Sequence, residues 1–322
     1  MPESASTLTL KTPRSFDLPQ AVCSYGYFLL APNLWNPARQ CLHRTLRGDD
    51  GRVVRVTLAQ PRRRRDLIKL TADRRLSPAE RTLFRRQVAR MLRLDEDLRP
   101  WFAMDPAARR RRYGRLFRSP TLFEDMVKTI TGCNVTWRNT MAMNRLLCLW
   151  AVPPEHEGGF PLPTELATLD PDDLKQRCKV GYRADRIVRL ARDLTTGALD
   201  PATLEDPAVD TDTLHTRLLA IHGIGPYAAA NLLQLLGRYD KLAIDTETYR
   251  HFCLTYGVKR PKNPLKLHRR IQRHYDRFAP YQFLAYWFEL WRGYERRFGP
   301  AITWDPIEHG PNFTAAYLNR EA

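Results

Sequence analysis

Short apolar runs alternate with turn-forming residues over the first hundred positions of the chain. Residues 8–10, 25–30 and 53–58 are apolar or β-branched, and Gly, Pro, Asn and Asp separate them, notably at positions 48–51. This pattern predicts antiparallel strands joined by turns. A helix is then expected to begin at Ser77, because Ser77-Pro78-Ala79-Glu80 combines an N-cap, a proline at the first helical position and an acid at the third.

Helical spacing of apolar residues dominates from about residue 100 onward, and proline and glycine mark the loops. The predicted helices are 120–133, 137–150, 164–168, 171–178, 183–195, 211–220, 226–236, 245–255, 264–277 and 280–297. We therefore expect an α+β fold whose N-terminal part, residues 1–100, contains an antiparallel β-sheet and ends in a helix. A predominantly α-helical part, residues 101–322, follows it.

The charge balance narrows the class of partner. The chain has 52 Lys and Arg against 35 Asp and Glu, a formal net charge of +17. Such an excess favours a polyanion, because each phosphate that a protein neutralises releases condensed counterions. Two arginine runs, 62–65 and 109–112, contribute to the excess. Their spacing is also typical of a solvated surface segment, so they assign no function by themselves.

The sequence contains no signal for a membrane or a metal cluster. No stretch approaches the roughly 20 apolar residues that span a bilayer, and residues 1–15 lack the apolar run of a secretory signal. We therefore expect a cytoplasmic, nucleoid-associated protein. The six cysteines are scattered with no C-x-x-C pair, which argues against a zinc ribbon, an iron–sulfur cluster or a disulfide framework. We expect no cofactor and read the cysteines as reduced, mostly buried side chains.

The most informative stretch is residues 218–230, where one predicted helix ends at a Gly-x-Gly turn and another begins at once with Pro226. Gly223 and Gly225 permit unusual backbone angles, and the unpaired N–H groups of a new helix form an anion site. The predicted phosphate-binding residues are Gly223, Ile224, Gly225, Tyr227 and Ala228. The same turn is also compatible with a tight helical hairpin that binds nothing.

The context of this turn favours the functional interpretation. Ile-x-Gly-Ile-Gly-x-x-Ala-Ala resembles the helix-hairpin-helix of the base-excision DNA glycosylase superfamily (HhH-GPD), and Asp245 follows Tyr227 by 18 residues, as that family requires. Residues 123–134, the Gly-Tyr-Arg-Ala block at 181–184 and the Leu-Asp-Glu-Asp-Leu block at 94–98 resemble further segments of the family. The resemblance is greatest to its 3-methyladenine glycosylase II and 8-oxoguanine glycosylase branches.

The resemblance implies a set of roles. The helix-hairpin-helix spans 211–236, and the segment 241–255 carries Asp245 as the catalytic carboxylate. Asn134 is implied as the wedge that fills the duplex after base extrusion. The carbonyls of Leu219, Ile221 and Ile224 are implied as ligands of Na⁺ or K⁺. Two of these residues also have a structural interpretation. Asp245 suits a helix N-cap, a role that is compatible with catalysis, and Asn134 suits a helix C-cap.

Strand cleavage is not expected. Family members that cut the backbone carry a Lys at the second residue after the Gly-x-Gly, where its amine forms a Schiff base with the sugar. Tyr227 occupies that place here. The resemblance therefore implies a monofunctional glycosylase that hydrolyses the N-glycosidic bond and leaves an abasic site.

The expected substrate is double-stranded DNA with a damaged base, bound by a monomer. Alkylated purines are cationic, so an electron-rich aromatic pocket would select them. The predicted pocket residues are Tyr182, Tyr227, Trp287 and Trp291, although the last two also fit a buried helix stripe. The alternatives are a mismatch or oxidised-base glycosylase of the same superfamily, and a non-catalytic DNA-binding protein that uses the hairpin only for phosphate contact.

Overall fold

The N-terminal part of the protein contains a five-stranded sheet in which every pairing is antiparallel. The computed structural model describes residues 5–48, 50–259, 261 and 263–310. The strands are β1 (Thr7–Lys11), β2 (Asn33–Asn36), β3 (Cys41–Arg47), β4 (Val53–Ala59) and β5 (Leu67–Ala72), in the spatial order β1-β5-β4-β3-β2. Along β4 and β5 every second side chain is buried, which gives the sheet one face toward the core. The α+β fold class is thereby confirmed.

One predicted strand is wrong. Residues 25–30 are almost entirely buried and form the 3₁₀ helix η1 (Gly26–Leu29) instead of a strand. A half-buried strand needs alternating apolar and polar positions, whereas this run is apolar on all sides. Its tyrosines Tyr25 and Tyr27 consequently point into the contact between the sheet and the helical part, where their hydroxyls bond to Asn231 and Thr129.

The predicted helices are confirmed with small differences at their ends. The long ones are α2 (Pro78–Leu92), α5 (Leu122–Gly132), α6 (Trp137–Trp150), α8 (Pro171–Cys178), α9 (Arg183–Thr195), α11 (Thr211–Leu219), α12 (Pro226–Leu235), α13 (Thr246–Tyr256), α14 (Pro264–Tyr275) and α15 (Gln282–Phe298). Short helices complete the fold: α1 (Leu18–Val22), α3 (Arg99–Met104), α4 (Pro106–Arg111), α7 (Pro163–Ala167) and α10 (Ala202–Glu205). The capping box expected at Ser77 and Glu80 opens α2.

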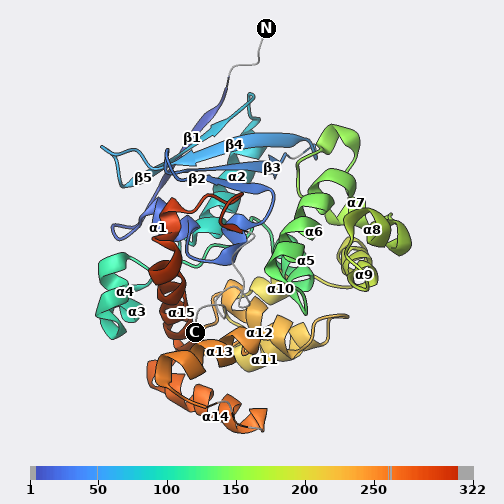
Figure 1. Ribbon diagram of the computed structural model, residues 1–322. Coiled ribbons are helices and arrows are strands. Elements are labelled where there is room, and N and C mark those ends of the chain that lie inside the picture. The colour runs from blue at the N-terminus through green and yellow to red at the C-terminus, as the bar shows by residue number, and fades with distance from the viewer. Residues whose placement is uncertain (1–4, 49, 260, 262, 311–322) are drawn as a thin grey trace.

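The sheet lies against the helices, and α15 runs from the lower helices to the sheet (Figure 1). The indole of Trp287 on α15 donates to the Ser24 carbonyl over 3.0 Å, and that of Trp35 on β2 donates to the Ile302 carbonyl over 2.9 Å. Buried apolar side chains of both parts form one continuous core. Helix α15 and the segment that follows it therefore fix the N-terminal part against the helical part.

The structure also bears on the expectations about membrane helices and about the cysteines. Within the described ranges, no helix combines the length and the hydropathy needed to cross a membrane. All six cysteines carry free thiols, and four of them are buried, as expected for reduced core residues.

Candidate nucleic-acid interface and active-site cavity

The glycine turn between α11 and α12 has the backbone geometry of an anion site. Gly223 has φ +85°, and a Cβ there would come within 2.6 Å of the Arg186 side chain, so only glycine fits. Gly225 is the N-cap of α12, caps it with no side chain, and faces open space. The first amides of α12, including those of Tyr227 and Ala228, therefore lack a capping side chain and remain available to an external anion.

Asp245 is the N-cap of α13. Its Oδ1 accepts hydrogen bonds from the Thr248 amide at 2.8 Å and from the Thr248 hydroxyl at 2.9 Å, while its own amide donates to Thr248 Oγ1. The capping interpretation is therefore confirmed. These bonds hold Oδ1 in place and fix the direction of the carboxylate, which is what a catalytic group requires.

The electrostatic environment of Asp245 is unusual for an acid. Burial raises its pKa, and the two hydrogen bonds from Thr248 oppose the shift only in part. The nearby charge that acts on it belongs to Glu247, which is itself an acid and raises the pKa further. Asp245 forms no ion pair within the described part of the chain, and a partly desolvated carboxylate without such a partner is a strong proton acceptor.

Asp245 lies on the wall of a cavity of about 520 Å³. Aromatic rings from η1, α6, α12 and α15 form much of this wall, and Trp287 lies between Tyr25, at 4.9 Å, and Phe283, whose ring is stacked on it at 5.8 Å. The aromatic lining residues are Tyr25, Tyr27, Trp137, Tyr227, Phe283, Tyr286, Trp287 and Tyr294. A planar base inserted here would meet π surfaces on several sides.

Two of the four predicted pocket residues line the cavity and two do not. Tyr227 and Trp287 belong to the wall. Burial and then the charge of Asp245 raise the pKa of Tyr227, which shows that its hydroxyl lies close to the carboxylate although 37% of the residue is exposed. Tyr182 instead lies at the surface, with the guanidinium carbons of Arg183 and Arg186 at 4.5 and 4.7 Å from its ring.

Trp291 also lies outside the cavity. Only 1% of the residue is exposed, and its ring packs against Trp287 at 5.6 Å and Trp304 at 5.5 Å. The cavity wall on α15 continues to Leu290 and Tyr294, so Trp291 is excluded because its side chain packs into the core. We therefore correct the predicted pocket by removing Tyr182 and Trp291: the former belongs to the surface of α9 and the latter to the core.

The polar part of the wall was not anticipated from the sequence. Lys128 and Thr129 of α5 and Asn231 of α12 line the cavity together with Tyr25 and Tyr27. Tyr25 donates to Asn231 Oδ1 at 2.7 Å, and the hydroxyls of Tyr27 and Thr129 are 2.7 Å apart. The sequence signal that could have found them is the polar face of the segment 124–129 within an otherwise apolar helix.

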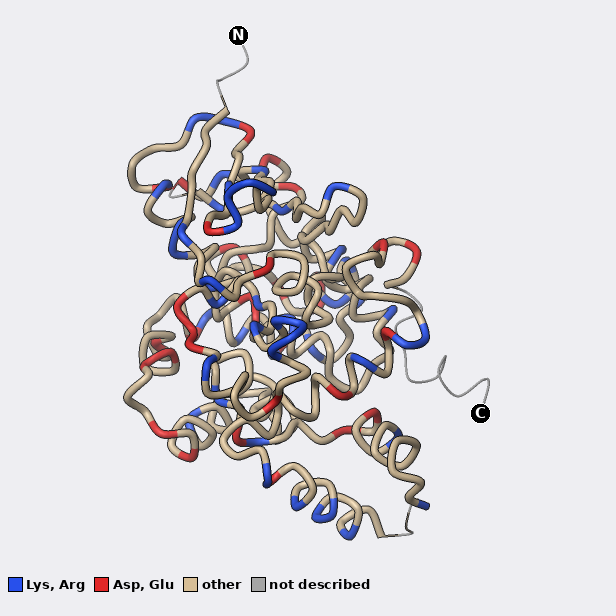
Figure 2. The backbone as a smooth tube through the Cα atoms, turned by 90° about the vertical axis from the view of Figure 1, so that its left-hand side faces the viewer, with Lys and Arg blue, Asp and Glu red and all other residues tan. Residues whose placement is uncertain are grey.

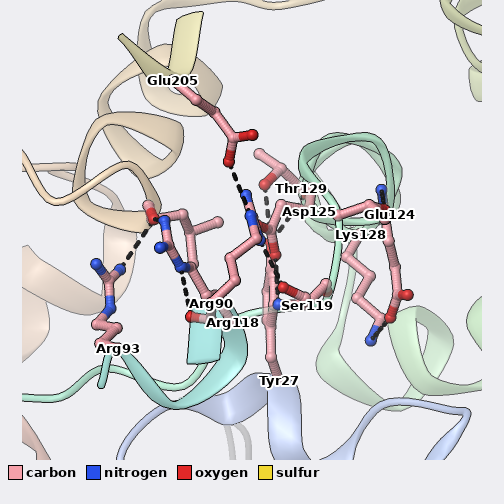
Figure 3. Close-up of polar contacts among 12 residues, drawn as sticks. Tyr27, Arg90, Arg93, Arg118, Ser119, Glu124, Asp125, Lys128, Thr129 and Glu205 are labelled. Atoms are coloured by element: carbon pink, nitrogen blue, oxygen red, sulfur yellow. Dashed lines mark hydrogen bonds and ion pairs between the residues drawn. The ribbon is translucent and has the colours of Figure 1, made fainter. Parts of the chain in front are cut away.

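Buried ion pairs surround that face of α5 (Figure 3). Glu124 contacts Arg44 of β3 at 2.5 Å and Lys128 at 2.7 Å, and Asp125 contacts Arg90 of α2 at 2.7 Å. Burial opposes the ionisation of Glu124, but the charges of Arg44 and Lys128 outweigh it and lower its pKa. Burial lowers the pKa of Lys128, and the pairing of Lys128 with Glu124 opposes this shift. The network joins the cavity wall to the sheet.

Asn134 lies just beyond the end of α5 with φ +51° and an exposed side chain. Arg183 holds this turn by donating to the carbonyls of Cys133 and Asn134. Val135, Thr136 and Trp137, which follow directly, line the cavity. The left-handed backbone fits the C-cap interpretation, and the exposure beside the cavity is compatible with the predicted wedge.

The carbonyls proposed for a monovalent cation come from the same hairpin. The Ile221 carbonyl accepts a 3.0 Å hydrogen bond from the Ile224 amide, which closes the turn tightly. A carbonyl oxygen has a second lone pair, so this bond leaves room for a cation. The Na⁺ or K⁺ site at Leu219, Ile221 and Ile224 stays a prediction.

Comparison with known proteins shows similarity in structure and none in sequence. No protein-family model and no curated protein matches the sequence. A 3-methyladenine DNA glycosylase from Archaeoglobus fulgidus superposes with TM-score 0.67 at 17% identity, covering 91% of this chain and all of that one. MBOgg1 in complex with a low-affinity DNA ligand gives 0.63 at 19% identity, covering 91% and 97%.

The 8-oxoguanine glycosylase/lyase from Clostridium acetobutylicum in its apo form gives TM-score 0.61 at 15% identity, covering 88% of this chain and 96% of that one. All three superpositions include both the N-terminal and the helical part of the chain, because about nine-tenths of its length is matched in each. The protein therefore has the same fold as these DNA glycosylase structures.

Proposed function

We propose that the protein is a monofunctional DNA glycosylase that releases a damaged base and leaves an abasic site. The observation that supports this most strongly is the placement of Asp245. A carboxylate with a raised pKa and no ion-pair partner among the described residues lies on the wall of an aromatic cavity, close to the uncapped first turn of α12. Because Tyr227 belongs both to that first turn and to the cavity wall, phosphate binding and base binding can occur on one strand.

The chemistry follows from these groups. The duplex must release the base from its stack before it can enter the cavity, which requires a few kcal/mol. As the C1′–N bond breaks, its electron pair leaves with the base, and positive charge develops on the sugar. Asp245 stabilises that charge and accepts a proton from the water whose oxygen bonds to C1′. The hairpin amides hold the adjacent phosphate while this occurs.

Neither Tyr227 nor Lys128 offers a suitable amine nucleophile, which fits hydrolysis without strand cleavage. Tyr227 occupies the position at which a Schiff-base lysine is implied by the family resemblance, and it has no amine. Lys128 also lines the cavity, but it is buried and paired with Glu124 at 2.7 Å. An ammonium held by a carboxylate is a poor nucleophile, because only the neutral amine attacks a sugar carbon.

An alkylated purine is the substrate class that we propose first. Eight aromatic residues line the cavity, and electron-rich rings favour a base that carries positive charge. One of the structures with this fold is described as a 3-methyladenine DNA glycosylase. A weakened glycosidic bond in such a base also reduces the demand for a general acid.

A neutral lesion such as hypoxanthine or 8-oxoguanine is the second candidate, and Lys128 favours it. Its ammonium lies 5.7 Å from the Tyr27 ring and has capacity for further hydrogen bonds. A buried positive charge in the wall repels a cationic base and attracts a carbonyl or ring-nitrogen acceptor. The aromatic rings and the lysine thus favour different lesions.

A lesion panel tests the proposal. Duplex oligonucleotides, each with one 3-methyladenine, 1,N6-ethenoadenine, hypoxanthine, uracil or 8-oxoguanine, are incubated with the enzyme and scored for abasic sites with and without alkali. We expect release of at least one lesion, strand breaks only after alkali, and no adduct trapped by borohydride. Breaks without alkali would refute the monofunctional assignment, and no release from any duplex would refute the glycosylase assignment.

A further inference from the structure

Helix α14 presents a face that carries only positive charge. Leu267, Ile271 and Tyr275 form its buried stripe. The opposite face carries Lys266, Arg269, Arg270 and Arg273, all exposed, and no Asp or Glu occurs between 263 and 275. The helix lies at the lower end of the molecule in Figure 1, and the tube of Figure 2 shows basic positions along it with no acidic one.

This arrangement does not stabilise the fold. None of the four basic side chains forms an ion pair with a carboxylate among the residues that the structure describes. Lys266 and Arg270, like Arg269 and Arg273, stand four positions apart, where like charges on a helix destabilise it by a few tenths of a kcal/mol. A solubilising surface would mix both signs of charge, so a face of one sign indicates a polyanionic partner.

A groove connects this face to the glycine turn. Its volume is about 880 Å³, with Pro226 and Tyr227 of α12 on one side and Arg269 and Arg273 of α14 on the other. Lys241, which is paired with Asp212 at 2.6 Å, and the acids Asp240 and Asp276 also line the groove. The two acids leave the groove itself only mildly basic, so its attraction for phosphate comes mainly from the arginines along its outer edge.

We propose that α14 is a second phosphate-binding surface, which holds the DNA backbone that continues beyond the nucleotide in the cavity. This inference rests on the proposed function. The argument is one of continuity: Tyr227 lines both the base cavity and the groove, and the uncapped amides of α12 lie between them. A strand whose damaged base enters the cavity would pass the glycine turn and then reach Arg269 and Arg273.

The test is the salt dependence of binding to a duplex of about 30 base pairs that carries one tetrahydrofuran abasic-site analogue. The variant is R269Q/R270Q/R273Q in the full chain, and the matched control is R62Q/R63Q/R110Q, which removes the same charge at exposed arginines elsewhere. We expect the α14 variant to reduce the slope of log Kobs against log salt by about 2 to 3 and the affinity at about 0.1 M salt by about tenfold. The control should change both by much less.

A second measurement locates the contact. The duplex is shortened from one end at a time, and the affinity of the wild-type protein is measured at each length. Shortening from one end should at some length lower this affinity to that of the α14 variant, whereas shortening from the other end should not. Equal slopes for wild type and α14 variant, or an equal loss for the control, would overturn the inference. Both measurements depend on DNA binding and not on base release. If no lesion is released but the salt slopes of wild type and α14 variant still differ, the glycosylase proposal is refuted and the α14 contact is still supported.

Discussion

Helices α5 and α13 both begin with acidic side chains and both contribute to the wall of the same cavity, but their acids have opposite surroundings. On α5, Glu124 and Asp125 are buried against Arg44, Lys128 and Arg90. On α13, Asp245 accepts hydrogen bonds from the hydroxyl and the amide of Thr248 and forms no ion pair with any residue that the structure describes. The pKa of Glu124 is consequently lowered and that of Asp245 raised.

Under the proposed function, this difference separates structural acids from the acid that we propose as catalytic. A buried carboxylate with an arginine partner is satisfied, and removing either partner leaves an uncompensated charge in the core. A carboxylate without a cation is less stable as an anion, and its charge is available to a developing positive centre in the cavity. We therefore expect changes on α5 to lower stability first and changes at Asp245 to lower catalysis without a loss of stability.

Asp245→Asn should give the largest effect. We expect base release in single turnover to fall by at least about 10³-fold, because the group that stabilises the sugar cation and accepts the proton is lost. Asn retains the N-cap, and the raised pKa means that ionised Asp245 lowers stability at neutral pH, so the melting temperature should equal or exceed that of wild type. Retained turnover, or unfolding of the variant, would contradict the distinction between the two helices.

Glu124→Gln should produce the opposite result. We expect the free energy of unfolding, measured in urea, to fall by about 3–5 kcal/mol, because Arg44 and Lys128 lose their shared buried partner. The control Glu155→Gln removes an exposed acid and should stay within about 0.5 kcal/mol of wild type. Unchanged stability of the Glu124 variant would mean that the ion pairs do not hold α5 to the sheet.

The pH dependence should distinguish the two acids in the wild-type protein. Base release requires ionised Asp245, so its rate should fall as the pH decreases through a pKa above the ordinary aspartate range. The stability contributed by Glu124 is present above its unfolded pKa and is lost only as the pH falls through its lowered folded value. Activity should therefore disappear while circular dichroism still reports a folded protein. Loss of activity and of folded structure at the same pH would contradict the expectation that activity is lost first.

Thr248→Ala should have the smallest effect of the four. It removes the hydroxyl donor to Asp245 Oδ1 but keeps the amide donor. We expect the pH midpoint of base release to rise and the rate at neutral pH to fall by about tenfold or less, as for the loss of one hydrogen bond to a charged group. A midpoint that moves to lower pH would show that Thr248 does not stabilise the carboxylate.

Local patterns in the sequence were sufficient for the long helices and for the local geometry around the candidate residues, but they did not predict the short helices α1, α3, α4 and α10. The ten predicted helices, the turn at Gly223 and Gly225 and the N-cap role of Asp245 depend on residues within one or two turns of one another. Such features are encoded by spacing and capping chemistry alone. The strand predicted at 25–30 failed because burial on all sides, which comes from distant elements, replaced the alternation that a strand needs.

The cavity depended on contacts between segments far apart in the chain. Tyr25, just before η1, and Tyr27 within it share one wall with Lys128 of α5 and Trp287 of α15 only because α15 returns to the sheet. Which aromatic rings border the cavity follows from how the helices cross, so Trp287 does and Trp291, one turn later, does not. Likewise, the sequence determined the net charge of +17 and the spacing of the four basic residues of α14, but packing through Leu267, Ile271 and Tyr275 decided that the basic face is exposed. Spacing along a helix fixes which residues share a face; only the fold decides what that face meets.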